Sequence, residues 1–384
     1  MNQRLHYIDW IRVLAFTILI LFHCAVPFTR FNWEVKNDTS SVLIDSIVMW
    51  FHQWRLPLIF FIAGVGVRFS LKKRSILKFV GERFVRLFLP LAFAMFFITP
   101  IQVYFEWLQQ GKISTGFAQF YPSVYNFVPY PDGALTWSHM WFVAYLFVFT
   151  ILLLPLFSLS KFKFHNHLKS FGERLFSTPI TQLFMAAPFI FYYFALYIKW
   201  PEQGSLVDDW FVFDSSITFY LFGFLFGNLQ NFWQNCLKYR KAFLGLALVL
   251  AIGLFPFYFW DAALPKQQGS KLYAFAIFNG LHIWTIILAV IGYAMRYLNT
   301  SNKYLSYLNT AVYPFYIIHQ ALIVALGYYV VQWHWPIVSK MLVLTVLSMA
   351  SMVLIYHFII KRTMLTRVLF GMKWKKGGRK NPVP

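Results

Sequence analysis

The sequence has few charged residues, and this scarcity excludes most classes of soluble protein. Only 12% of its 384 residues are charged, whereas 59% are hydrophobic. Soluble domains carry about 25% charged residues, and no polar stretch here is long enough to form such a domain. The composition therefore predicts that lipid surrounds most of the chain.

Acidic residues and cysteines are scarce too. The 13 Asp and Glu residues are outnumbered by 34 Lys and Arg residues, which gives a net charge of +21. In a soluble protein this excess would suggest nucleic-acid binding, but here the basic residues follow a membrane topology and we expect no nucleic-acid partner. Cys24 and Cys236 are expected on opposite sides of the membrane, which excludes a disulfide bond between them.

Long hydrophobic runs make up much of the sequence. A membrane-spanning helix needs about 20 mainly apolar residues, and these runs lack the alternation that is typical of barrel strands. We therefore predict an all-α integral membrane protein with about ten transmembrane helices, in one domain over residues 1–365, followed by a basic tail, 366–384. The predicted spans are 9–28, 44–68, 86–106, 138–158, 179–198, 214–231, 242–260, 271–294, 309–332 and 338–360.

The loops predict the orientation of these spans. Lys and Arg accumulate in the cytoplasmic loops of membrane proteins. With ten spans, most basic residues fall on the side of the N-terminus and most acidic residues fall on the other side. We therefore expect both termini in the cytoplasm and the protein in the inner (plasma) membrane.

The first span carries three ionisable residues, Asp9, Arg12 and His23. Such residues inside a membrane are costly and are functional candidates by default. Asp9 and Arg12 are three residues apart and can pair on one helix face. His23 lies about 16 Å further along the helix axis and on nearly the same face as Arg12. The alternatives are that Arg12 only anchors the helix and that a neighbouring helix satisfies His23.

The second span contributes His52 and Arg55 near its outer end, three residues apart on one face. Arg55 could instead extend its guanidinium to the membrane surface. Pro57 and the following run Phe60 to Gly64 predict a kink and then close packing against another helix at Gly64.

Arg83 and Arg86 open the third span from the cytoplasmic side. Together with Arg12 they could form a cationic pocket, because guanidinium groups bind phosphates through paired hydrogen bonds. The alternative is that they reflect only the excess of basic residues on the cytoplasmic side.

The remaining histidines fall into two groups. His139 and Trp141 begin the fourth span on the external side, and His319 lies near the middle of the ninth. His282 and His357 lack polar companions, which favours a structural role for them. Arginines at the inner face and histidines toward the outer face indicate a site with two ends, for a phosphate-bearing donor inside and an acceptor outside.

These residues resemble the motifs of the acyltransferase 3 family of bacterial membrane O-acyltransferases. The Arg-x10-His motif of the family is met by Arg12 and His23, and its Arg-x-x-Arg motif by Arg83 and Arg86. The chain looks most like the glucan-biosynthesis C branch, which is associated with succinylation of periplasmic glucans. Three other segments are similar to family motifs: Phe60 to Gly64, His139 to Phe142, and Tyr313 to His319.

The resemblance implies an acyl-CoA donor in the cytoplasm, whose phosphates Arg83, Arg86 and Arg12 would bind, and a glycan acceptor on the periplasmic or cell-surface side. Acetyl and succinyl both remain open as the transferred group. No bound cofactor and no metal ion are expected.

The resemblance also implies the site. His23, with Arg12 and Asp9, is the expected catalytic group, either as a general base or as a nucleophile that carries the acyl group. Arg55 could hold the free carboxylate of a succinyl group. A transporter or channel is the competing function, since it too would need intramembrane His and Arg, although no internal repeat supports it. The residues expected to bind the acceptor or the acyl group are His52, Arg55, His139, Trp141 and His319.

Overall fold

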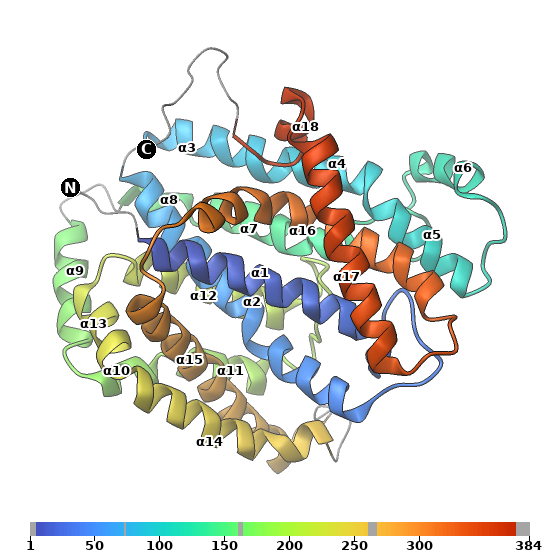
Figure 1. Ribbon diagram of the computed structural model, residues 1–384. Helices are drawn as coiled ribbons and strands as arrows, with labels where there is room; N and C mark the ends of the chain where they lie inside the picture. Colours follow the sequence, from blue (N-terminus) through green and yellow to red (C-terminus); the bar gives the residue numbers. More distant parts are fainter. Residues whose placement is uncertain (1–4, 73, 160–163, 260–266, 374–384) are drawn as a thin grey trace.

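The computed structural model describes residues 5–72, 74–159, 164–259 and 267–373, and it is helical, with no β-strand among these residues (Figure 1). The predicted tail falls mostly on 374–384, outside the described residues. The helices are α1 His6–Ala25, α2 Val42–Leu71, α3 Ile76–Arg83, α4 Leu89–Phe97, α5 Thr99–Gln109, α6 Phe117–Phe120, α7 Trp141–Leu152, α8 Leu154–Leu159, α9 Phe164–Leu175, α10 Pro179–Phe184, α11 Ala187–Ala195, α12 Trp210–Phe226, α13 Gln230–Lys238, α14 Arg240–Phe259, α15 Ser270–Tyr297, α16 Lys303–Val330, α17 Ile337–Ile355 and α18 Met364–Leu369.

Within the described residues, seven helical segments are long and apolar enough to cross a membrane, and nine if two bent pairs each count as one span. The bent pairs are His167–Leu175 with Pro179–Ala195, at 105°, and Trp210–Phe226 with Gln230–Lys238, at 104°. Ser138–Leu152 is a shorter apolar helix. Every predicted span overlaps a helix, but the number of about ten is not confirmed. The predicted span 138–158 is divided between the short apolar helix Ser138–Leu152 and α8, and the predicted spans 179–198 and 214–231 each belong to a bent pair.

Helix α1 occupies the centre of the molecule, where it packs against α16, α2 and α15 (Figure 1). Ile11, Phe16 and Leu19 of α1 are buried in the main hydrophobic core. The helix is straight over its 20 residues, so its ends are held about 30 Å apart at 1.5 Å per residue. Asp9 and His23 therefore lie near opposite ends of one rigid element.

The closest helix contact joins α2 and α12, as the sequence predicted at Gly64. A Cβ atom on Gly64 would overlap the carbonyl oxygen of Tyr220, and one on Gly223 would overlap that of Phe61. Residues without a side chain let the two backbones approach. This contact holds the C-terminal half of α2 against α12.

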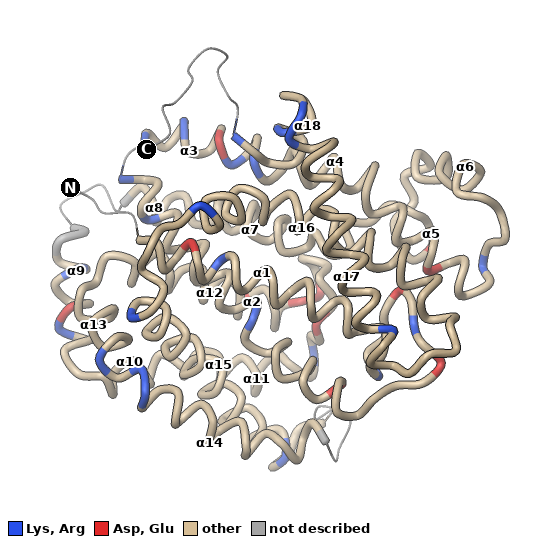
Figure 2. Tube along the Cα trace, in the orientation of Figure 1, with Lys and Arg blue, Asp and Glu red and all other residues tan. Residues whose placement is uncertain are grey.

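Charged residues are unevenly distributed over the fold. Figure 2 shows most Lys and Arg residues along the left and upper edges of the view, around α3, α9, α13 and α18. The N-terminal end of α1 lies on this side, whereas its C-terminal end points into the interior beside acidic residues (Figure 2). The two ends of α1 thus meet different electrostatic surroundings.

Candidate active site

A cavity of about 580 Å³ opens at the C-terminal end of α1, and we call it the outer cavity. It lies between α1, α2, α5, the start of α7, α16 and the loops that precede α2 and α12. Its polar wall contains Asn32, Glu34, His23, His52, Arg55, Gln102, Glu106, Ser138, His139, Glu202 and Gln320, and its aromatic wall contains Phe22, Phe31, Trp33, Tyr130, Trp137, Trp141, Phe142 and Tyr316.

His23 lines this cavity and is oriented by His319 of α16. Nδ1 of His319 lies 2.5 Å from the carbonyl oxygen of Tyr316, and its Nε2 lies 3.1 Å from Nδ1 of His23. A carbonyl oxygen only accepts, so Nδ1 of neutral His319 carries the hydrogen and its Nε2 accepts from His23. The free lone pair of His23 is therefore on Nε2, the atom that a base or a nucleophile would use.

His319 itself does not line the cavity and is fully buried. Its ring lies 4.9 Å from the His23 ring and 5.1 Å from the His139 ring, measured between centroids. From its sequence context His319 is predicted to bind the acceptor or the acyl group, but its contacts place it behind His23, outside the cavity lining. The geometry is that of a group that orients a base.

His139 also lies at the cavity wall, with both ring nitrogens engaged by protein. Its Nε2 donates to the carbonyl oxygen of Ile317 at 3.0 Å, and its Nδ1 accepts from Nε2 of Gln102 at 3.0 Å. The hydroxyl of Tyr316 donates to the His139 carbonyl oxygen at 2.5 Å. His139 thus joins α5, α7 and α16, while its neighbour Trp141 presents its ring to the cavity.

Arg55 is a buried cation in the wall of the outer cavity. The residue is 2% exposed, and its guanidinium lies 3.8 Å above the centre of the Phe22 ring. Its Nε and Nη1 have no hydrogen-bond partner among the described residues. Because leaving a buried charged donor unpaired is costly, these two atoms mark a place for an anionic or polar group of a substrate.

His52 pairs with an acidic residue from a distant loop. Its Nε2 lies 2.9 Å from Oε2 of Glu202. Burial raises the pKa of Glu202, but the His52 contact and the charge of Arg55 outweigh it, so the pKa is below its usual range. Glu202 thereby supplies a negative charge beside Arg55, and it closes one side of the cavity.

Glu34 is a second acidic residue that the sequence analysis missed. Its Oε1 accepts from Nε2 of Gln320 at 2.6 Å and from Oγ of Ser138 at 3.4 Å. Its buried Oε2 has no partner among the described residues. Burial raises the pKa of Glu34 to about 7. Glu34 and Glu202 both lie in loops, where no helical periodicity singles them out.

Two adjoining cavities lie toward the N-terminal end of α1, and we call them together the inner cavity, with a larger and a smaller lobe. Its larger lobe measures about 910 Å³ and its smaller lobe about 320 Å³. Both lobes are lined by Arg12, Gly66, Ser70 and Arg74. Asp9 and Lys72 line the larger lobe, and Arg83 and Arg86 line the smaller.

Arg12 and Asp9 therefore lie with the other arginines and apart from His23. Nη1 of Arg12 donates to Oδ1 of Asn309 at 3.1 Å, and Nδ2 of Asn309 donates to Oδ1 of Asp9 at 3.1 Å. Arg86 belongs to a π-helical turn, Phe84–Phe88, between α3 and α4, and such turns are frequent at functional sites. The structure brings together Arg12, Arg83 and Arg86 and adds Arg74, which the sequence analysis did not single out.

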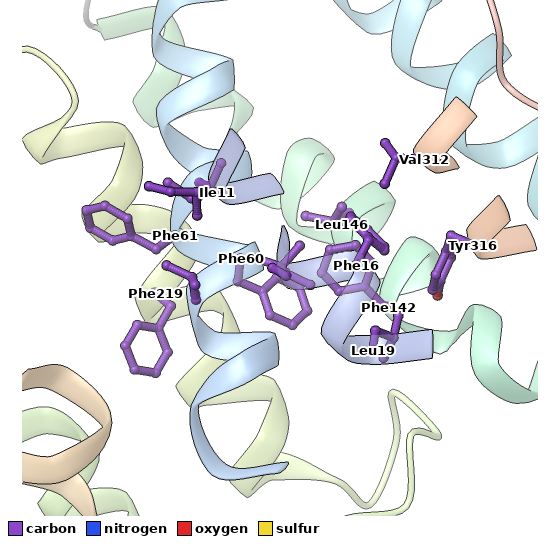
Figure 3. Packing of buried hydrophobic residues seen from close by; sticks show 14 of the residues in the cluster. Ile11, Phe16, Leu19, Phe60, Phe61, Phe142, Leu146, Phe219, Val312 and Tyr316 are labelled. Carbon is purple, nitrogen blue, oxygen red and sulfur yellow. The ribbon is translucent and has the colours of Figure 1, made fainter. Parts of the chain in front are cut away.

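Three aromatic side chains, which we call the aromatic layer, pack together where the outer cavity and the smaller inner lobe come closest, and Figure 3 labels all three. The layer consists of Phe16 from α1, Phe142 from α7 and Tyr316 from α16. The Phe16 ring lies 5.3 Å from that of Tyr316 and 6.4 Å from that of Phe142. Phe142 lines both the outer cavity and the smaller inner lobe. The outer cavity, with His23, and the smaller inner lobe thus share a wall at this layer.

The described residues include no group of three or more His, Cys, Asp and Glu side chains arranged to hold a metal ion. What the outer cavity offers is a basic imidazole nitrogen, a buried guanidinium and acidic groups near an aromatic wall. This combination suits proton transfer to and from a hydroxyl-bearing substrate.

Comparison with known proteins gives a consistent result. A family model described as an acyltransferase domain matches residues 5–357. Glucans biosynthesis protein C of Escherichia coli strain K12 is 27% identical over 158 residues, which are 40% of this chain and 39% of that protein. The protein of the same name from Escherichia coli O1:K1 / APEC matches to the same extent. The chain thus aligns with well under half the length of these relatives, and no solved structure matches it.

Proposed function

Because the chain belongs to the acyltransferase 3 family and is a multi-pass membrane O-acyltransferase, we propose that it transfers an acyl group from cytoplasmic acyl-CoA to a hydroxyl of a periplasmic or cell-surface glycan. The observation that carries this proposal is the position of His23. Its free Nε2 lies at the outer cavity, one aromatic layer away from a cationic inner cavity.

In the proposed reaction, Nε2 of His23 removes the proton from the acceptor hydroxyl. The hydroxyl oxygen attacks the thioester carbonyl, the carbon–sulfur bond breaks, and the imidazolium returns the proton to the departing CoA sulfur. Nδ1–H of the imidazolium donates to Nε2 of His319 throughout, which stabilises the charged form. Nε2 would also be the attacking atom if an acyl-histidine formed first, so both routes need the same orientation of His23.

The lining of the outer cavity supports a sugar as the acceptor. Trp33 and Trp137 offer flat faces against which the apolar face of a sugar ring can pack. Glu106, which accepts from the hydroxyl of Tyr130 at 2.7 Å, and Asn32 offer hydrogen-bonding groups for sugar hydroxyls. The relatives are named as glucans biosynthesis proteins, which agrees with this assignment.

Arg55 is the residue that we assign to the acyl group. Its unpaired Nε or Nη1 would donate a charge-assisted hydrogen bond to the free carboxylate of a succinyl group. With an acetyl group they would instead face the oxygen that becomes negative during transfer. The cationic inner cavity, with Arg12, Arg83 and Arg86, would hold the phosphates of the donor, which requires the N-terminal end of α1 to lie in the cytoplasm of an inner-membrane protein.

Mass spectrometry of periplasmic and surface glycans tests the proposal. Cells would carry the wild-type protein, His23→Ala or no copy of the gene, and the two protein variants would be matched for their amount in the membrane. We expect an acetyl or succinyl mass increment on a glycan only with the wild type. Identical glycan profiles in all three strains would refute the proposed function.

A further inference from the structure

The larger lobe of the inner cavity contains side chains that the proposed reaction does not use. It lies where the chain turns by 104° between α12 and α13. The amide side chains of Gln230 and Gln234 line it from α13, and Trp233 lies between them. Residues four apart share a helix face, so both amides point to the same side.

The wall of this lobe combines three recognition elements. Arg12, Lys72 and Arg74 contribute positive charge, which suits phosphate groups. Gln230 and Gln234 are exposed, and no described residue accepts a hydrogen bond from either side-chain amide. Amide side chains of this kind bind the polar edge of adenine, and aromatic side chains stack on bases. A lipid phosphate would use the cations but would leave the amides without partners.

The wall is also held in a fixed shape. Nε1 of Trp233 donates to the carbonyl oxygen of Phe226 at 3.1 Å, which ties α13 to the end of α12. The carboxylate of Glu173 accepts from the backbone N–H groups of Gln230 and Asn231 at 2.8 and 2.9 Å, which ties the start of α13 to α9. The amides are therefore presented from a braced helix, which lowers the entropy cost of binding.

The two lobes adjoin each other at Gly66. Gly66 and Ser70 lie one turn apart on α2 and line both lobes. A Cβ atom added to Gly66 would meet no atom within 4 Å, so the space beside this residue is open.

We propose that the larger lobe is a nucleotide-binding subsite, in which Gln230 and Gln234 bind adenine beside Trp233 and Lys72 and Arg74 bind the phosphate nearest to it, while the rest of the same molecule extends past Gly66 toward Arg83 and Arg86 in the smaller lobe. This inference rests on the proposed acyl-CoA donor and specifies how the donor is held. It assigns adenine binding to α13, which contains none of the motif residues Arg12, Arg83 and Arg86.

Binding measurements on the purified full-length protein in detergent test the subsite. The probes are CoA, adenosine 3′,5′-bisphosphate and pantetheine, measured by calorimetry with the wild type and with Gln230→Ala/Gln234→Ala. We expect the double substitution to weaken binding of CoA and of the bisphosphate by the same factor, about ten-fold or more, and to leave pantetheine binding unchanged. Equal affinity of the wild type and the variant for the bisphosphate would overturn the proposal. So would a bound bisphosphate that phosphatidylglycerol displaces and CoA does not.

A second variant tests the proposed path past Gly66. Gly66→Phe should abolish acyl transfer but retain binding of adenosine 3′,5′-bisphosphate, because its ring blocks the way between the lobes. Gly245→Phe is the matched control, since Gly245 is also a helical glycine with no atom within 4 Å of an added Cβ and lies outside both cavities. Normal transfer by a folded Gly66→Phe protein would refute this path. If the nucleotide binds as expected but no variant or wild-type protein transfers an acyl group, the subsite stands and the proposed function fails.

Discussion

Replacing His319 by alanine removes the hydrogen-bond acceptor of His23 and leaves the outer cavity lining intact. The bond that is lost joins Nδ1 of His23 to Nε2 of His319 at 3.1 Å. When His23 becomes charged during the reaction, this is a hydrogen bond to a charged group, which contributes about 1.5–3 kcal/mol. The loss corresponds to a fall in kcat of about ten- to 150-fold.

The assay is acyl transfer from acyl-CoA with membranes that contain matched amounts of each variant. His319→Ala should lower kcat with little change in KM, because His319 contacts neither cavity. His319→Gln should restore part of kcat, since its side-chain oxygen can accept from Nδ1 of His23.

His282→Ala is the matched control for this substitution. His282 is also fully buried, and its Nδ1 donates to the carbonyl oxygen of Ala247 at 2.9 Å, but it lines neither the inner nor the outer cavity. We expect it to lower thermal stability and to leave kcat per folded molecule unchanged. Wild-type kcat in His319→Ala, or equal losses in the two variants, would refute the proposed role of His319 as a positioning residue.

Three further predictions concern other parts of the structure. Arg55→Gln should reduce transfer from succinyl-CoA far more than transfer from acetyl-CoA, and equal losses with the two donors would contradict a carboxylate contact. Burial raises the pKa of Glu34 from 4.5 to about 7, so the folded state favours the protonated carboxyl and stability should fall as pH rises from about 4.5 to 7. Glu34→Gln should flatten this part of the profile of Tm against pH, and an unchanged profile would exclude Glu34 as its cause. Gly64→Ala should lower Tm or prevent folding, because the added Cβ overlaps the α12 backbone; Gly66→Ala on the same helix is the control and should have little effect.

The sequence predicted the features that depend on helical periodicity. The spacing of Arg12 and His23 determines their separation because α1 is one straight helix, and the close contact at Gly64 follows from the missing side chain. The number of spans was harder to predict, because each bend of about 105° joins an apolar helix to a polar one, α9 or α13, and the apolar run 138–158 is divided between two short helices. Hydropathy measures the length of an apolar run and contains no information about its direction.

The residues that sequence reasoning missed come from loops or act through another residue. Glu34 and Glu202 lie outside the helices and reach the outer cavity only through the path of their loops. His319 was singled out, but its partner is 296 positions away in the chain, so its contact with His23 depends on how α16 packs against α1. Pairings of this kind follow from tertiary packing and leave no local pattern in either segment.

In the proposed reaction, the aromatic layer between the cavities would let reactants from opposite sides of a membrane meet without an open pore. Phe16, Phe142 and Tyr316 come from three helices, and their apolar rings pack between the inner and the outer cavity. Ions and water would lose hydration there, which is costly, whereas the uncharged thioester end of a donor loses little. The charges of the donor stay among the arginines of the inner cavity, and those of the acceptor side stay around Arg55 and Glu202. Only the reacting group has to enter the layer, and His23 lies directly beyond it on the same helix as Arg12.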